Sequence, residues 1–121
     1  MKALFDLDCE LVGWLAPNQH IFDTDMNWVA YVANGHAWSS ETADWLGAVV
    51  GLCCQDIDGR AVAWNPELGP VSSVRSARPS RSAKPARPAR PARPARPSRP
   101  ARPSTPAGGW STLTFVAWLS Q

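Results

Sequence analysis

The sequence lacks any long hydrophobic run. Its longest apolar stretch, from Ala48 to Cys54 with Gly51 inside it, is far shorter than the ~20 residues that a membrane-spanning helix needs. Asp6 and Asp8 interrupt the first residues, where a secretory signal requires an apolar segment. These two absences predict a chain with no membrane span that resides in the cytoplasm.

Cysteine is scarce, and the common catalytic patterns are missing. Cys9, Cys53 and Cys54 form neither a C-x-x-C pair nor an even set, so we expect small buried residues or spare thiols. His20 and His36 have no partner at an interpretable spacing, and no phosphate loop, nucleophile elbow or zinc spacing occurs. The sequence therefore predicts a protein that is not an enzyme and has no cofactor or metal.

The two signs of charge occupy different halves of the chain. All ten acidic residues lie at or before Glu67, and ten of the twelve basic residues lie at or after Arg75. Residues 1–70 carry two basic and ten acidic residues, a net charge of −8, whereas residues 71–121 carry +10. The formal total of +2 averages two segments of opposite charge.

Aromatic residues divide the chain in the same way. None occurs between Trp64 and Trp110, a stretch rich in proline and arginine that cannot supply a core. We therefore expect a folded domain at 1–70, a disordered low-complexity tract at 71–109 and an apolar segment at 110–121.

A repeat of about seventeen residues organises the first segment. An Asp-x-Asp pair begins units at positions 6, 23 and 56, and Ser40-Glu41-Thr42 supplies a weaker fourth unit at 40. Each unit continues with a Val or Leu, then a Gly or Ala, then usually an aromatic residue. These three columns are Val12, Val29, Leu46 and Val62; Gly13, Ala30, Gly47 and Ala63; and Trp14, Tyr31, Ala48 and Trp64.

Each unit has the length of a β-hairpin, and aspartate favours turns by accepting hydrogen bonds from its own downstream amides. The turns are expected at Asp6–Glu10, Asp23–Asn27, Ser40–Asp44 and Asp56–Arg60. Strand alternation places the Val/Leu and aromatic columns on one face and the Gly/Ala column on the other. The small residues predict a crowded centre, with four hairpins in a pseudo-four-fold ring.

This pattern resembles the bacterial 4-fold beta flower proteins, over about residues 1–65 and 109–121. The resemblance rests on the four hairpin units, their Val-Gly/Ala-aromatic triplets, the Pro/Arg-rich stretch and the closing Trp-Ser-Thr-Leu motif. It implies an all-β fold of four hairpins and no particular activity. The third unit departs from the pattern, since Ser40 and Thr42 replace both aspartates and Ala48 replaces the aromatic residue.

The Pro/Arg-rich tract repeats Ala/Ser-Arg/Lys-Pro with a period of three from Ala83 to Pro103. Polyproline II also has three residues per turn, so the cations follow one edge at intervals of ~9.3 Å. Guanidinium groups bind phosphate, which predicts a nucleic acid or other polyanion as partner. Two alternatives stay open: an inert spacer, and recognition of Pro-x-x-Pro-x-Arg by an aromatic groove. The predicted polyanion-binding residues are Arg78, Arg81, Lys84, Arg87, Arg90, Arg93, Arg96, Arg99 and Arg102.

The C-terminal segment is apolar again. Thr114 is a plausible N-cap, and Phe115 and Trp118 share a helical face, so a short helix or a strand should dock on the β domain. An acidic β domain with a cationic arm predicts an interaction module. The alternative function is a small-molecule or glycan-binding domain, in which rings stack on the ligand and the tract is a spacer; its candidate residues are Trp14, Tyr31 and Trp64.

Overall fold

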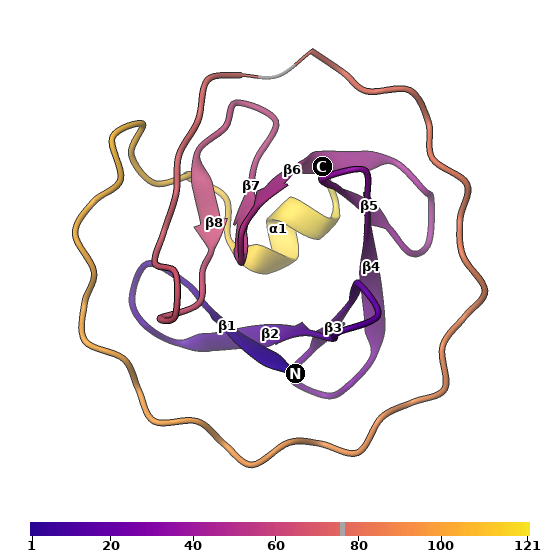
Figure 1. Cartoon of the computed structure of the whole chain (residues 1–121), viewed down its shortest axis with the longest axis horizontal. Coiled ribbons are helices and arrows are strands. Elements are labelled where there is room, and N and C mark those ends of the chain that lie inside the picture. Colours follow the sequence, from indigo (N-terminus) through magenta and orange to yellow (C-terminus); the bar gives the residue numbers. More distant parts are fainter. Residues whose placement is uncertain (76) are drawn as a thin grey trace.

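The structure, a computed structural model, describes residues 1–75 and 77–121. Within these residues, antiparallel strands form one sheet in chain order (Figure 1). The strands are β1 (Lys2–Phe5), β2 (Leu11–Leu15), β3 (His20–Asp23), β4 (Trp28–Ala33), β5 (His36–Ser39), β6 (Trp45–Val50), β7 (Cys53–Gln55) and β8 (Ala61–Ala63). Phe5 and Trp64 exchange two backbone hydrogen bonds of 2.8 and 2.9 Å, which nearly close the sheet into a barrel. The all-β prediction is confirmed.

Consecutive strands pair into four hairpins, numbered 1 to 4 from β1–β2 to β7–β8. In hairpin 1, Asp6 Oδ1 accepts hydrogen bonds from the backbone amides of Asp8 and Glu10, both at 2.9 Å. Asp23 and Asp56 accept the same pair of bonds in hairpins 2 and 4, at 2.9 to 3.0 Å. The three turns predicted from Asp-x-Asp are confirmed, with the carboxylate as their organising group.

The turn of hairpin 3 begins one residue earlier than predicted. Ser39, not Ser40, accepts from the following amides, at 3.3 and 3.4 Å, and its own amide bonds to the oxygen of Asp44. This turn therefore contains one more residue than the other three. A serine hydroxyl replaces the aspartate carboxylate in this turn. Without the Asp-x-Asp pair, the sequence pattern does not fix the first residue of the turn.

The C-terminal segment forms α1 (Phe115–Leu119), which lies inside the ring of strands (Figure 1). Thr114 caps it through a bond of 3.1 Å to the amide of Ala117, and the fully buried Trp118 donates its indole N–H to the backbone oxygen of Gln55 at 3.0 Å. Buried apolar residues from all four hairpins surround the helix, and we call them the lumen cluster. Its strand residues are Leu4, Leu15, Ile21, Ala30, Ala37, Leu46, Cys54, Val62 and Ala63.

The glycines of the Gly/Ala column let neighbouring strands approach closely, and Gly13 also leaves room for the ring of Phe115 in the helix. A Cβ on Gly13 would lie 2.5 Å from the backbone oxygen of Phe22 and 3.3 Å from the ring of Phe115. At Gly47, which has a φ of +140°, a Cβ would lie 2.0 Å from the backbone oxygen of Gln55. The predicted crowding is present at both glycines.

A β-bulge interrupts the second strand of every hairpin. In hairpin 1 the pairing shifts between Leu4 and Phe5, which leaves Val12 as the extra residue. A bulge offsets the alternation by one place, so Val12 and Gly13 both contact the lumen, whereas Trp14 belongs to a second cluster on the opposite face. The prediction that the Val/Leu and aromatic columns share a face is wrong, because it assumed an uninterrupted pleat. The other bulge residues are Val29, Leu46 and Val62.

In the described part of the chain, no helix has the length and apolar character to cross a bilayer.

Candidate polyanion interface

Residues 77–103, which we call the arm, run around the outside of the barrel as an extended ring (Figure 1). The arm contains no helix or strand, as polyproline II predicts; its disorder stays a prediction. Both ends of the ring are held at the same place. The Ser72 hydroxyl donates to the backbone oxygen of Gly109 at 2.8 Å, and the Ser73 amide donates to the oxygen of Gly59 at 2.9 Å.

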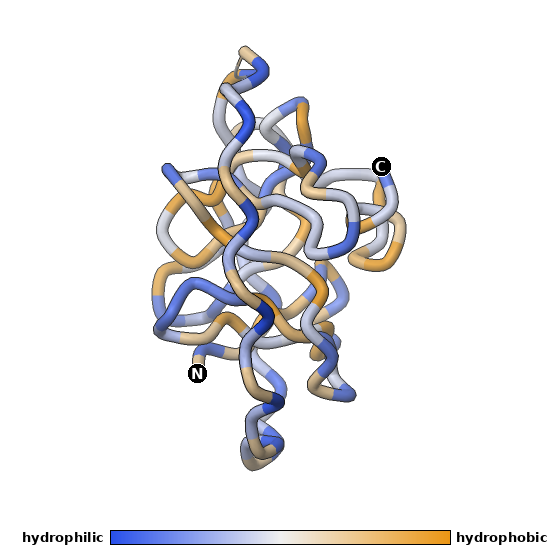
Figure 2. The backbone as a smooth tube through the Cα atoms, turned by 90° about the vertical axis from the view of Figure 1, so that its right-hand side faces the viewer, coloured by the Kyte–Doolittle hydropathy of each residue, from blue (hydrophilic) through white to orange (hydrophobic). Residues whose placement is uncertain are grey.

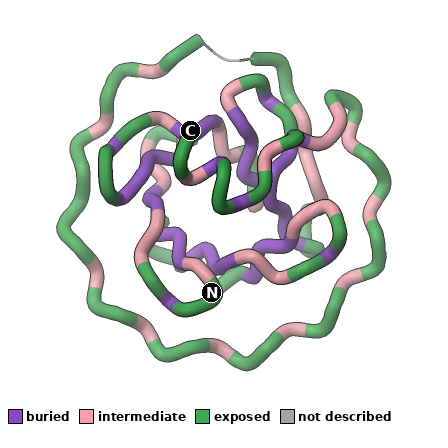
Figure 3. Tube along the Cα trace, turned by 180° about the vertical axis from the view of Figure 1, so that it is seen from behind, coloured by how far each residue is buried: buried purple, intermediate pink, exposed green. Residues whose placement is uncertain are grey.

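One edge of the arm packs on the barrel, and its cationic side chains stay exposed. All nine predicted polyanion-binding residues are exposed. Figure 3 shows exposed residues alternating with half-buried ones along the ring, and Figure 2 shows hydrophilic residues recurring where the arm crosses in front of the barrel. The half-buried prolines are Pro79, Pro88, Pro91, Pro94, Pro97, Pro100 and Pro103. The three-residue period thus separates a packing edge from a charged edge.

Three arginines of the arm reach equivalent positions on three hairpin turns. Arg99 donates to the backbone oxygen of Asp8 at 2.7 Å, and Arg90 to that of Asp25 at 2.6 Å. In hairpin 3, Arg81 donates to the oxygen of Thr42 at 3.2 Å. Each acceptor precedes a residue with positive φ: Cys9, Met26 and Ala43. The arginines are nine residues apart, three turns of polyproline II, and they meet the turns in reverse chain order.

Ion pairs accompany these bonds. Arg93 lies 3.2 Å from the carboxylate of Asp25, and Arg99 lies 3.4 Å from that of Glu10. The side chains in these pairs are 58 to 75% exposed, so each pair contributes at most ~1 kcal/mol and weakens with salt. The arm is held by several weak, screened contacts.

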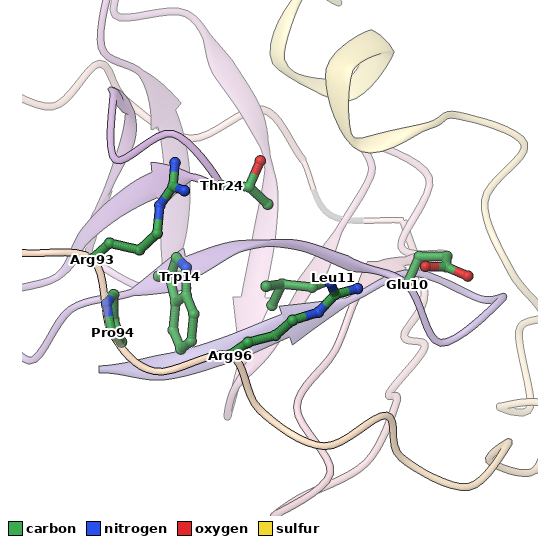
Figure 4. Close-up of a pocket in the computed structure, with 7 residues that line it drawn as sticks. All are labelled: Glu10, Leu11, Trp14, Thr24, Arg93, Pro94 and Arg96. Carbon is green, nitrogen blue, oxygen red and sulfur yellow. The ribbon is translucent and has the colours of Figure 1, made fainter.

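A hollow of about 330 Å³ lies between the arm and hairpins 1 and 2 (Figure 4). Pro94 stands beside Trp14 with Arg93 and Arg96 on either side, and Glu10 lies at the far end of the hollow (Figure 4). The residues that line the hollow are Glu10, Leu11, Trp14, Thr24, Arg93, Pro94 and Arg96. This wall combines an indole with a carboxylate, which suits a segment that alternates proline and arginine.

A second contact lies over hairpin 2. Lys84 Nζ is 5.6 Å from the ring centroid of Trp28, whose edge meets the ring of His20. His20 Nδ1, Trp28 Nε1 and the Tyr31 hydroxyl are buried without a hydrogen-bond partner among the described residues. Burial lowers the pKa of His20 and raises that of Tyr31, which the nearby Arg81 opposes.

The structure buries the three rings considered for ligand stacking. Trp14, Tyr31 and Trp64 are 4, 2 and 2% exposed, and Trp64 donates its indole N–H to the oxygen of Asp6 at 2.7 Å. With the arm in place the three rings are buried, and Trp14 lines the hollow beside Pro94. Ligand stacking on these rings stays a prediction. Within residues 1–75 and 77–121, no group of three or more His, Cys, Asp or Glu side chains could hold a metal.

The contacts between arm and turns were not foreseen residue by residue. The sequence identified the cations, but it did not indicate which of them touch the barrel. Two periods in the sequence were available as a signal. Equivalent turn residues recur every seventeen residues, and the arm repeats every three residues, so its arginines can meet equivalent turns if the distance between turns is a whole number of arm repeats.

Comparison with known families gives one match. The family model described as 4-fold beta flower protein matches residues 2–119, a range that includes the hairpins, the arm and α1. The searches of curated proteins and of solved structures returned no match.

Proposed function

Since the chain belongs to the 4-fold beta flower family, and since that membership carries a fold but no activity, we propose a function from the arm: the protein is a non-enzymatic interaction module whose cationic arm holds a polyanion. Nucleic acid is the partner with the matching chemistry. The proposed location is the cytoplasm.

One observation carries this proposal. The nine cations of the arm are all exposed, although the half-buried prolines between them keep the backbone close to the barrel. An extended backbone pressed against a folded domain presents its charges in a fixed row. A row of this kind loses less conformational freedom on binding than a free cationic tail would.

The chemistry is phosphate binding without base recognition. Guanidinium groups form paired hydrogen bonds with phosphate oxygens, and nothing in a repeated Ala-Arg-Pro unit reads base edges. We expect affinity to fall steeply with salt: if about half of the ten cations after residue 70 engage, log affinity against log salt should have a slope of roughly −4 to −5.

The acidic barrel competes with the polyanion for the same arginines. Residues 1–70 carry −8, and four arginines of the arm already contact hairpin turns: Arg81, Arg90, Arg93 and Arg99. A polyanion must displace these contacts or use the other cations. Because the contacts are exposed and weak, displacement is feasible at physiological salt.

Two matched variants test the proposal by fluorescence anisotropy with labelled single- and double-stranded oligonucleotides. The first carries Arg78→Gln, Arg87→Gln, Arg96→Gln and Arg102→Gln, and the second carries Arg81→Gln, Arg90→Gln, Arg93→Gln and Arg99→Gln. Both lose four charges, but the second also loses its contacts with the barrel. We expect the first variant to bind more weakly than the second. If the natural chain fails to bind at low salt, the arm is a spacer.

A further inference from the structure

We propose that the ring of hairpin turns is itself a docking surface, and that its occupant from another molecule is the arm of a second copy of this chain. The surface consists of the turn oxygens of hairpins 1 to 3 and the carboxylates beside them. This interaction is separate from polyanion binding, because it uses the acidic barrel and not phosphate as the partner of arginine.

The chain's own arm shows what the surface accepts. The backbone oxygens of Asp8, Asp25 and Thr42 each receive an arginine N–H at 2.6 to 3.2 Å. The carboxylates of Asp25 and Glu10 add ion pairs at 3.2 and 3.4 Å. The occupant is therefore extended and cationic, with arginines at nine-residue intervals.

Repetition makes arm segments interchangeable. Arg81, Arg90 and Arg99 occupy the same kind of acceptor, and nine residues of polyproline II rise ~28 Å from one to the next. A segment from another molecule that presents two arginines at this spacing meets the same two acceptors. Nothing in the contact depends on the covalent connection between arm and barrel.

The geometry also allows an arm to reach a neighbour. Its 27 residues measure ~84 Å along polyproline II, so its midpoint can extend ~40 Å from the anchors at Ser72 and Gly109. Because both ends stay anchored, the arm leaves as a loop, and this length suffices for two adjacent turns of a neighbour. The tethered arm has an effective concentration of ~1 mM for its own barrel, so pairing between copies becomes visible when the internal contact is removed.

Two full-length variants weaken the internal contact from opposite sides: one removes arginines of the arm, and the other removes carboxylates of the barrel and keeps the backbone oxygens of the turns. The chain that we call arm-neutral carries Arg81→Gln, Arg90→Gln, Arg93→Gln and Arg99→Gln, which removes four of the arm's nine cations, and keeps an acidic barrel. The chain that we call barrel-neutral carries Glu10→Gln, Asp25→Asn and Asp58→Asn, which removes three of the ten acidic residues, and keeps its cationic arm; Asp58, on hairpin 4, is included because it pairs at 3.7 Å with Arg75, just before the arm. Both retain the turn-forming carboxylates, which are Asp6, Asp23 and Asp56.

Sedimentation velocity at low salt measures the result. Each variant alone should be a monomer, and the equimolar mixture should form a 1:1 dimer that dissociates as salt rises. The control replaces the arm-neutral chain with one that also carries the three barrel substitutions; mixed with the barrel-neutral chain, it should stay monomeric.

The proposal is overturned if the mixture of correctly folded variants, checked by tryptophan fluorescence, stays monomeric at low salt and ~1 mM chain. It is also overturned if a labelled peptide of residues 77–103 binds the arm-neutral chain while the chains do not pair. That result would make the surface a receptor for free segments only. The sedimentation experiment contains no polyanion, so it and the oligonucleotide experiment can fail independently.

Discussion

Arg90 donates from Nη2 to the backbone oxygen of Asp25 at 2.6 Å, although the two residues are 65 positions apart in the sequence. The same relationship recurs nine residues earlier at Arg81 and nine residues later at Arg99. The repeats of the arm and the repeated hairpin turns of the barrel are thus aligned, with one arginine in every nine residues at each of these three turns. The charge separation seen in the sequence corresponds to a physical contact between the two halves of the chain.

The arm should contribute little to stability. Replacing residues 77–103 with a short Gly/Ser linker should leave the melting temperature nearly unchanged, because the arm contacts the barrel through exposed arginines and half-buried prolines and buries no large apolar side chain. A short linker can join the ends, since Ser72 bonds to Gly109 directly. Differential scanning calorimetry measures the effect. A fall of many degrees would show that the half-buried prolines stabilise the barrel.

The helix in the lumen should be essential for the stability of the barrel. Trp118→Ala removes a fully buried indole and its bond to the oxygen of Gln55, and should lower the free energy of unfolding by about 3–5 kcal/mol. Val116→Ala, on the same helix but 74% exposed, is the matched control and should change it by no more than ~0.5 kcal/mol. Urea unfolding distinguishes them. Equal effects would mean that α1 does not fill the barrel in solution.

At Gly47, steric overlap with the neighbouring strand should destabilise a substitution more than backbone strain does. Gly47→Ala places a Cβ against the backbone of β7 as well as straining φ, and should cost about 3 kcal/mol or more. Gly35→Ala also has positive φ, +78°, but its Cβ would meet nothing within 4 Å, so strain alone should cost about 1–2 kcal/mol. Chemical denaturation of both variants gives the difference. A Gly47 variant no less stable than the Gly35 variant would contradict the close approach of β6 and β7 at this position.

Alkaline pH should destabilise the barrel through its buried thiols. Burial raises the pKa of Cys53 from its ordinary 9.0 to about 11, and burial beside Cys53 raises that of Cys54 as well. The thiols of the unfolded chain lose their protons near pH 9, while those of the folded chain keep them. Deprotonation therefore stabilises the unfolded state relative to the folded state as pH rises from 9 to 11. Each thiol should lower the free energy of unfolding by about 1.4 kcal/mol per pH unit in this window.

Urea unfolding under reducing conditions, at several pH values across that window, tests this slope. The double variant Cys53→Ala and Cys54→Ala should be less stable at neutral pH, but its stability should fall less steeply above pH 9. Parallel slopes for the two proteins would assign the alkaline loss to other groups, such as the buried Tyr31, whose pKa burial also raises.

The turns were predictable because their chemistry is local. Asp6, Asp23 and Asp56 bond to amides two and four residues later, so a short motif contains everything that determines the turn. The bulges were not predictable in the same way. Whether Val12 is extra depends on the pairing of two strands, and a single strand read alone shows only alternation.

The position of the helix and the path of the arm could not be predicted from the sequence, for a related reason. Phe115 and Trp118 show an apolar face, but not that this face fills a barrel lined by small and branched apolar side chains. Likewise, arginine at every third position marks a charged edge without showing which arginines meet a turn. Both features depend on the dimensions of the closed ring, which no local pattern contains.

The three-residue period makes the register of the arm a discrete quantity. Adding one Ala-Arg-Pro triplet preserves the proline edge and moves every later arginine by ~9 Å, so the arginine three residues earlier takes its place at the acceptor. An insertion of one or two residues instead turns the proline edge away from the barrel. Changes in arm length that preserve the contact therefore come in multiples of three residues.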